Sequence, residues 1–317
     1  MCSGKYQPHE NILELSLCPG FHGRMLTGTY TAIVTPFRNG KLDLAALRNL
    51  IERQVKAGVD GIVPVGTTGE SPTLNYEEHI EVIAQSVKAA AGRIQVMAGT
   101  GGNSTSEAVY LTAEAEKVGA DSMLQVAPYY NKPTQEGLYQ HFLEVTRATK
   151  LPMILYSIPS RCGVEIAVET VRRLASVTPR VVGIKEAGGT PDRVSQLRAA
   201  LGRRFSIFCG DDSMTLPFMA VGAHGVVSVA SNIIPKQVAQ MARACAAGDF
   251  ATALKWHDRF YPVFKDLFVE TNPVPIKAAL AMLGQIEEEY RLPLVPMSPA
   301  NRAILKATLI RCGILKP

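Results

Sequence analysis

From residue 29 onward, short runs of consecutive apolar residues alternate with longer stretches in which apolar residues recur every three or four positions. The short runs are typical of strands buried on both faces, and the longer stretches are typical of helices that bury one face. Strands that alternate with helices favour a parallel sheet covered by those helices. The predicted strands are 31–34, 61–65, 94–98, 123–127, 153–156, 181–184, 205–208 and 226–229.

Local signals at the ends of the predicted helices support this pattern. The first three helices are each followed by a glycine, Gly58, Gly92 or Gly119, which can take the left-handed conformation that ends a helix. Asn75 and Glu78 have the spacing of a capping pair at the start of the second helix. The repetition indicates one strand–helix unit used many times.

Eight such units between residues 29 and 234 predict a closed (β/α)₈ barrel. A doubly wound sheet is the alternative, but no glycine-rich dinucleotide turn opens the first helix. The predicted organisation is an N-terminal tail (1–24), a catalytic barrel (25–234) and a C-terminal helical region (235–317). Prolines are expected to divide that last region into short helices, at positions 262, 273, 275, 293, 296 and 299.

Composition excludes several classes of protein. The 33 Lys and Arg against 28 Asp and Glu give a net charge of +5, but the basic residues are scattered and no basic run is interleaved with aromatic residues. Nucleic-acid binding is therefore not expected, whereas carboxylate substrates fit a mild positive charge. No segment is apolar enough for a membrane span, no signal peptide is recognisable, and a cytoplasmic protein is expected. Free thiols are expected at the widely spaced cysteines, which are Cys2, Cys18, Cys162, Cys209, Cys245 and Cys312.

Lys185 is the strongest candidate for covalent chemistry. It directly follows the apolar run 181–184, and in a barrel the functional groups lie at the C-terminal ends of the strands. Burial there lowers the pKa of an amine and provides the neutral form that attacks a ketone. The alternative is a structural ion pair with the neighbouring Glu186.

Two loops after predicted strands carry polar groups. Segment 66–71 (GTTGES) offers hydroxyls and backbone N–H groups that can bind a carboxylate, although an ordinary hydrogen-bonded turn is an equal alternative. Segment 210–212 (GDD) is expected to cap the next helix with an aspartate rather than to bind a cation. No metal site is expected, since no two histidines have the i, i+4 spacing among His9, His22, His79, His141, His224 and His257.

Aromatic and basic side chains follow the fourth and fifth predicted strands. Tyr129 and Tyr130 come after the fourth, and Tyr156 ends the fifth. A phenol beside an amine can transfer the protons that imine formation requires, although most tyrosines serve packing. Arg161 comes soon after, where a guanidinium can hold a carboxylate, with a solvated loop arginine as the alternative.

Together these segments resemble the family of pyruvate-dependent Schiff-base lyases that includes dihydrodipicolinate synthase, N-acetylneuraminate lyase and 2-keto-3-deoxygluconate aldolase. Several separate motifs in the family's order make the resemblance specific. It covers residues 25 to about 297 and rests on 66–71 (GTTGES), 127–133 (APYYNKP), Tyr156, 159–161 (PSR), 183–187 (GIKEA), 210–212 (GDD) and 268–273 (FVETNP).

The resemblance implies that Lys185 forms an imine with pyruvate and that Thr68, Tyr156 and Tyr130 relay protons. In the family that last tyrosine reaches a neighbouring subunit, which implies a homo-oligomer, commonly a tetramer of two tight dimers. No cofactor is implied. The substrate-binding residues implied by the resemblance are Thr67, Thr68, Arg161, Gly210 and Val227.

Within the family, Arg161 favours the synthase branch, because relatives that act on sialic or sugar acids generally lack this arginine. The implied reaction is the condensation of pyruvate with L-aspartate 4-semialdehyde, on the route to lysine through diaminopimelate. The alternatives are another aldolase of the family, acting on a sugar acid or on 4-hydroxy-2-oxoglutarate, and a non-catalytic sensor of small acids.

The sequence departs from the family pattern at a few positions. Ser157 replaces the usual asparagine, and Cys162 replaces a common threonine, but neither change removes a reacting group. Tyr76 replaces a histidine that is common in lysine-inhibited enzymes, so inhibition by L-lysine is only a weak expectation. The residues that match the family's allosteric site are Ser71, His79, Asn103, Glu107 and Tyr129.

Overall fold

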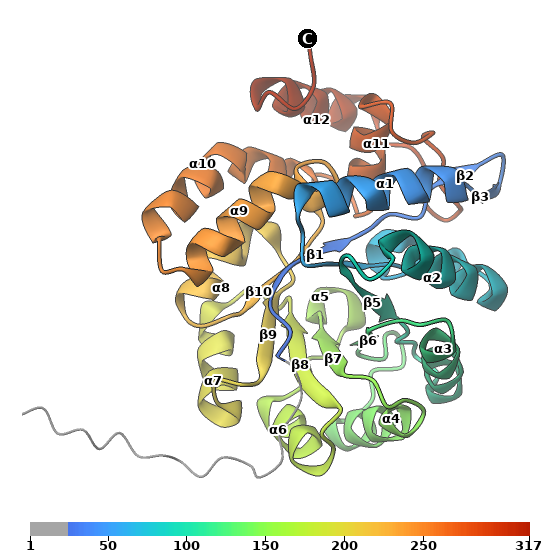
Figure 1. Ribbon diagram of the computed structural model, residues 1–317, viewed down its shortest axis with the longest axis vertical. Helices are drawn as coiled ribbons and strands as arrows, with labels where there is room; N and C mark the ends of the chain where they lie inside the picture. The colour runs from blue at the N-terminus through green and yellow to red at the C-terminus, as the bar shows by residue number, and fades with distance from the viewer. Residues whose placement is uncertain (1–24) are drawn as a thin grey trace, which may run out of the picture.

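The computed structural model describes residues 25–317, so the predicted tail 1–24 lies outside the described residues. Eight parallel strands form a closed barrel in the order β1, β10, β9, β8, β7, β6, β5, β4, which confirms the predicted (β/α)₈ fold (Figure 1). The barrel strands are β1 (Gly28–Ala32), β4 (Gly61–Val63), β5 (Gln95–Gly99), β6 (Ser122–Val126), β7 (Met153–Ser157), β8 (Val181–Glu186), β9 (Ser206–Cys209) and β10 (Gly225–Ser228).

Helices surround the barrel in the order in which they follow the strands (Figure 1). A small hairpin of β2 (Phe37–Arg38) and β3 (Lys41–Leu42) precedes the first of them. The helices around the barrel are α1 (Leu44–Ala57), α2 (Tyr76–Ala90), α3 (Thr105–Lys117), α4 (Gln135–Arg147), the short α5 (Pro159–Cys162), α6 (Val168–Val177), α7 (Pro191–Leu201), α8 (Thr215–Ala220) and α9 (Pro235–Ala246).

The local signals read from the sequence have the expected geometry. Gly58, Gly92 and Gly119 all have a positive φ, between 68° and 92°. Asn75 caps α2 by accepting a hydrogen bond from the Glu78 backbone, and the Glu78 side chain accepts one from the Asn75 backbone. These caps end and begin helices where the chain turns back toward the barrel.

The strands are apolar throughout because both of their faces are buried. Ile154 of β7 points into the barrel, while Met153 and Leu155 belong to the larger core between the strands and the helices. Tyr30 and Phe208 fill the barrel interior in an edge-to-face contact with ring centroids 5.3 Å apart. The interior is therefore packed, and the space for chemistry lies at the ends of the strands.

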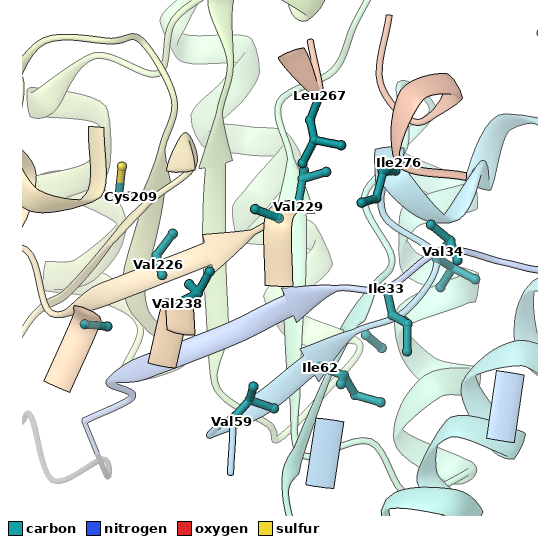
Figure 2. Close-up of a cluster of buried hydrophobic side chains, with 14 of the residues drawn as sticks. Ile33, Val34, Val59, Ile62, Cys209, Val226, Val229, Val238, Leu267 and Ile276 are labelled. Carbon is teal, nitrogen blue, oxygen red and sulfur yellow. The ribbon is translucent and has the colours of Figure 1, made fainter. Parts of the chain in front are cut away.

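Three further helices form the C-terminal part of the chain, namely α10 (Phe250–Asp266), α11 (Val274–Met282) and α12 (Pro299–Arg311). They lie outside the ring of helices, with α10 packed on α9 and α12 (Figure 1). Leu267 and Ile276 share one buried cluster with Val34 and Val229, which follow the first and last barrel strands (Figure 2). The C-terminal part is thus attached to the barrel by a continuous apolar core.

The expectation that Pro262 separates two helices was wrong, because Pro262 lies inside α10. Proline removes one hydrogen bond from a helix, the one to the carbonyl four residues earlier. That carbonyl belongs to Asp258, which is exposed and can bind water instead. The helix α9, which the predicted boundary at residue 234 assigns to the C-terminal region, packs against β1 and β10.

Candidate active site

Lys185 lies near the end of β8, where its side chain is only 7% exposed. The parallel register places Tyr156 of β7 directly beside it. The Lys185 Nζ atom lies 3.9 Å from the centre of the Tyr156 ring. The sequence prediction of an amine in an apolar barrel mouth therefore corresponds to the observed position.

The surroundings of Lys185 favour the neutral amine. Burial, and after it the positive charge of Arg161, lowers the pKa of Lys185 to about 7 against the opposing effect of the Asp212 carboxylate. An ordinary lysine is almost fully protonated at neutral pH, whereas this one has a large neutral fraction. The neutral form is the nucleophile that an imine-forming enzyme needs.

Glu186 has partners of its own. It accepts a hydrogen bond from the Gly188 backbone at 2.6 Å and forms an ion pair with Arg193 at 3.3 Å. Within residues 25–317, no ion pair joins it to Lys185. The structure therefore does not support the alternative that Lys185 forms an ion pair with Glu186.

Gly210 gives the Lys185 side chain the room that it occupies. A Cβ atom added at Gly210 would lie 2.7 Å from the Ala187 Cβ and 3.0 Å from the Lys185 Cε. A residue with a Cβ atom would press on both of these side chains. Val227, the other predicted substrate-binding residue near β9 and β10, is buried in the interior cluster together with Tyr156.

The turn after β4 brings two threonines to the barrel mouth. Thr67 and Thr68 lie in a single 3₁₀ turn, Thr67–Gly69. Thr67 lies close enough to Tyr156 to lower the pKa of its phenol. The Thr68 hydroxyl instead accepts a hydrogen bond of 3.0 Å from the Asn272 amide. The structure thus places Thr67 near Tyr156 and pairs the Thr68 hydroxyl with Asn272.

Tyr156 and Arg161 lie close enough to influence each other's charge. Burial raises the pKa of the Tyr156 phenol, while Arg161 and Thr67 act in the opposite direction. The phenol is protonated at neutral pH and can donate. Arg161 is exposed on α5, and its guanidinium donates a hydrogen bond of 3.1 Å to the Asn272 carbonyl. The Asn272 carbonyl thus holds the guanidinium of an otherwise exposed residue.

Tyr130 does not join this group. Its side chain is 91% exposed, and its backbone has φ = 72°, a left-handed conformation that is unusual for a residue with a bulky side chain. The Tyr130 ring therefore points away from the body of the single chain. Among the predicted relay residues, it is the one that the single chain leaves in the solvent.

The two aspartates after β9 have separate roles. Asp211 caps the following 3₁₀ turn by accepting from the Ser213 backbone at 2.8 Å, as predicted for this segment. Asp212 is buried and accepts hydrogen bonds from Ser228 and from the backbone of Val229 and Ala230. Burial raises the pKa of Asp212 to about 6.

The residues predicted for lysine binding lie around the start of α2 and α3. Burial, and after it the Glu107 carboxylate, raises the pKa of the half-buried Tyr129. The His79 ring binds the Gly99 carbonyl at 2.8 Å, and burial lowers its pKa to about 4, so the ring is neutral. The structure brings Tyr129 and Glu107 near each other.

The remaining members of this predicted group have local partners. Ser71 begins a short 3₁₀ turn (Ser71–Thr73), and the Asn103 carbonyl accepts a hydrogen bond of 2.9 Å from Asn131. Tyr76, which stands in place of a histidine, lies against Tyr110 with ring centroids 5.4 Å apart. A tyrosine pair therefore occupies this surface.

Other predictions concern metals, membranes and thiols. In the part of the chain that the structure describes, no three His, Cys, Asp or Glu side chains are grouped to hold a metal ion. No helix within residues 25–317 is long and apolar enough to cross a membrane. Cys2 and Cys18 lie outside the described residues, and the cysteines that the structure shows as free thiols are Cys162, Cys209, Cys245 and Cys312.

Several residues that shape this site were not predicted from the sequence. Asp212 was visible as part of the GDD motif, but its burial and its electrostatic effect on Lys185 were not. Asn272 was visible only as part of the FVETNP match, yet it contacts both Thr68 and Arg161. Lys277 gave no signal at all, because it is one of many lysines in helical stretches.

Comparison with known proteins identifies the family. The model of the dihydrodipicolinate synthetase family matches residues 25–311. The chain belongs to this family. A curated relative from Aquifex aeolicus, named 4-hydroxy-tetrahydrodipicolinate synthase, is 53% identical over 90% of this chain and 97% of its own.

Solved structures of this family agree with the fold. The synthase from Methylacidiphilum fumariolicum SolV is 56% identical, with a TM-score of 0.90, over 91% of this chain and 96% of its own. The Aquifex aeolicus enzyme is 52% identical, with a TM-score of 0.91, over 92% of this chain and all of its own. Two other relatives were solved with ligands, the Acinetobacter baumannii enzyme with pyruvate and the Cyanidioschyzon merolae enzyme with lysine.

These comparisons confirm the predicted family and the prediction of an enzyme of the lyase type. The curated relatives at 46–53% identity are named 4-hydroxy-tetrahydrodipicolinate synthase, which favours the synthase over the sugar-acid aldolase and the sensor. The roles of individual residues follow from the geometry and are proposed below.

Proposed function

We propose that the protein acts as a 4-hydroxy-tetrahydrodipicolinate synthase, condensing pyruvate with L-aspartate 4-semialdehyde through an imine on Lys185, in lysine biosynthesis through diaminopimelate. The observation that carries the proposal is the buried Lys185 amine, whose pKa burial lowers to about 7, in contact with the Tyr156 ring. Membership of the synthase family supports the choice of substrates.

In this mechanism the neutral Lys185 amine attacks the keto carbon of pyruvate, and loss of water gives the imine. Loss of a proton from the methyl carbon then gives an enamine, whose carbon attacks the aldehyde carbon. Cyclisation through the substrate's own amine releases the product and restores the Lys185 amine. Tyr156, which is protonated at neutral pH and has Thr67 nearby, donates and recovers the protons of the first step.

The pyruvate carboxylate is assigned to the turn that contains Thr67 and Thr68. This turn follows β4, just as Lys185 lies near the end of β8, and a carboxylate bound there would fix the keto carbon near the amine. Gly210 and Val227 complete the wall of this subsite, one by leaving space and the other by excluding water.

Arg161 is assigned to the carboxylate of L-aspartate 4-semialdehyde. It is fixed on one side by the Asn272 carbonyl and remains open to the solvent, as an arginine that receives a substrate should be. The sugar-acid alternative would not need a cation at this position. Assay of both aldehyde classes distinguishes the two reactions.

The exposed Tyr130 supports a homo-oligomer, a tetramer built from two tight dimers, in which this phenol enters the neighbouring subunit's relay. A ring that is 91% exposed on a left-handed backbone has no packing purpose in the single chain. Analytical ultracentrifugation tests the assembly, and a monomer with full activity would contradict this role for Tyr130.

Inhibition by L-lysine at the site of Tyr129 and Glu107 is proposed as a regulatory property, and a cytoplasmic location as its setting. The carboxylate and the phenol suit an amino-acid ligand, while Tyr76 in place of histidine weakens the match. Initial rates that stay constant across millimolar L-lysine would remove the regulatory proposal.

The decisive test of the Schiff-base mechanism is borohydride reduction of the purified protein in the presence of pyruvate, followed by peptide mapping. The expected result is one pyruvate adduct, located on Lys185 and absent from the variant Lys185→Ala. Binding of pyruvate without any adduct would overturn the mechanism and favour the sensor.

A further inference from the structure

A buried ion pair connects the C-terminal region to the turn that follows β4. The Lys277 Nζ atom of α11 contacts the Glu70 carboxylate, and both side chains are completely buried. The same ammonium lies 4.4 Å from the centre of the Phe37 ring and 5.4 Å from that of Tyr290. The pair is therefore enclosed by aromatic walls.

Stability alone does not account for this pair. Removing two charges from water costs about as much as their attraction returns, and apolar residues of similar size are often as stable or more so. The position of Glu70 is more informative, because it comes directly after the 3₁₀ turn of Thr67 and Thr68. The pair thus fixes one end of the proposed carboxylate-binding turn.

The backbone of Glu70 has a conformation that needs such support. Its φ of 55° is left-handed, which is a strained conformation for a residue other than glycine. Its second carboxylate oxygen accepts a hydrogen bond of 3.4 Å from the Arg291 backbone. Two groups from the C-terminal region, Lys277 and Arg291, therefore hold the Glu70 carboxylate.

The same region also reaches the middle of the turn. The Asn272 amide donates 3.0 Å to the Thr68 hydroxyl, and the Asn272 carbonyl receives Arg161. Asn272 and Lys277 are thus five residues apart and hold Thr68 and Glu70, which are two residues apart. Residues 272–277, which lie outside the barrel, therefore contact the turn at both Thr68 and Glu70.

We propose that Lys277 is a positioning residue for the keto-acid subsite: by binding Glu70, it fixes the 3₁₀ turn in the orientation that receives the substrate carboxylate. This inference rests on the proposed role of that turn in binding pyruvate. It gives the C-terminal region a part in substrate recognition, in addition to its packing on the barrel.

The main test is the double variant Glu70→Gln with Lys277→Met, which removes both charges and approximately keeps both shapes. Because an uncharged pair is tolerated in a buried site, its melting temperature should stay near that of the parent. The expected effect is a rise of about tenfold in the KM for pyruvate, with the KM for the aldehyde within about twofold of the parent.

Glu70→Gln alone is a second variant that keeps an acceptor for the Lys277 ammonium, and it should give an intermediate rise in the pyruvate KM. Leu280→Ala is the matched control, since Leu280 is fully buried on the same helix but belongs to the apolar core. It should lower the melting temperature and leave the pyruvate KM unchanged.

A folded double variant with a normal pyruvate KM would overturn the proposal, and so would an equal rise in the Leu280→Ala control, which would indicate general loosening. Borohydride trapping separates these results from the proposed function. If the parent protein gives the Lys185 adduct and the double variant has normal kinetics, only the role of Lys277 fails.

Discussion

Replacing Lys185 with methionine is predicted to raise the stability of the protein while abolishing its turnover. Burial lowers the pKa of this lysine from 10.5 to about 7, because the fold disfavours the ammonium. Below about pH 7 the amine is protonated in both the folded and the unfolded chain, and the folded state then carries the full cost, about 5 kcal/mol as an upper bound.

The cost decreases as the pH rises from about 7 and disappears above the pKa of the unfolded chain, 10.5, where the amine is neutral in both states. The methionine variant has no charge to bury at any pH. Its advantage over the parent should therefore be greatest in mild acid and should shrink as the solution becomes alkaline.

Calorimetric melting at matched protein concentration, near pH 6 and near pH 10, measures this difference. The Lys185→Met variant should melt several degrees above the parent near pH 6 and by a smaller margin near pH 10. Lys56→Met is the control, because that side chain is 74% exposed and should show no such pH dependence. A Lys185→Met variant that melts at or below the parent near pH 6 would refute the reasoning.

Two further predictions concern the rate. Arg161→Met removes a positive charge that lowers the pKa of Lys185, so the acid limb of kcat/KM for pyruvate should move to higher pH; an unmoved limb in the pH–rate profile would contradict the coupling. Thr67→Val should lower kcat about a hundredfold, because Thr67 lies near the Tyr156 phenol, while Thr68→Val should affect kcat less. Steady-state kinetics that show the reverse order would assign the relay role to Thr68.

The barrel was predictable because each local signal agreed with the global fold. Runs such as 153–156 are apolar at every position, which is typical of a strand covered on both faces, and the structure places β7 there. The ends of the strands were predicted less accurately than their positions. The first strand begins three residues earlier than predicted, at Gly28, because Gly28 and Thr29 pair with β10 despite their small or polar side chains.

The prolines of the C-terminal region did not all mark the ends of helices. Pro273, Pro275 and Pro299 lie at the starts of α11 and α12, where a missing N–H costs nothing. Pro262 lies within α10, which is held on both sides by α9 and α12. Tertiary packing decides whether a proline ends a helix, and the local sequence does not contain that information.

The position of Lys185 followed from the rule that parallel strands gather their C-terminal ends at one edge. The sequence did not predict which threonine hydroxyl lies near Tyr156. Thr67 and Thr68 lie in one tight 3₁₀ turn, and the orientation of that turn decides which of them faces the phenol. A change of one residue in such a turn redirects a side chain. Spacing in the sequence cannot resolve it.

The support of the turn was the hardest feature to foresee, since its two contacts join residues more than 200 positions apart. Asn272 to Thr68 spans 204 residues and Lys277 to Glu70 spans 207. The strand pattern places the turn at the barrel mouth, but nothing in it indicates which later segment will cover the turn. Because a buried lysine and a buried glutamate are each costly alone, finding one of them enclosed implies the other, and that inference becomes available only when the fold is known.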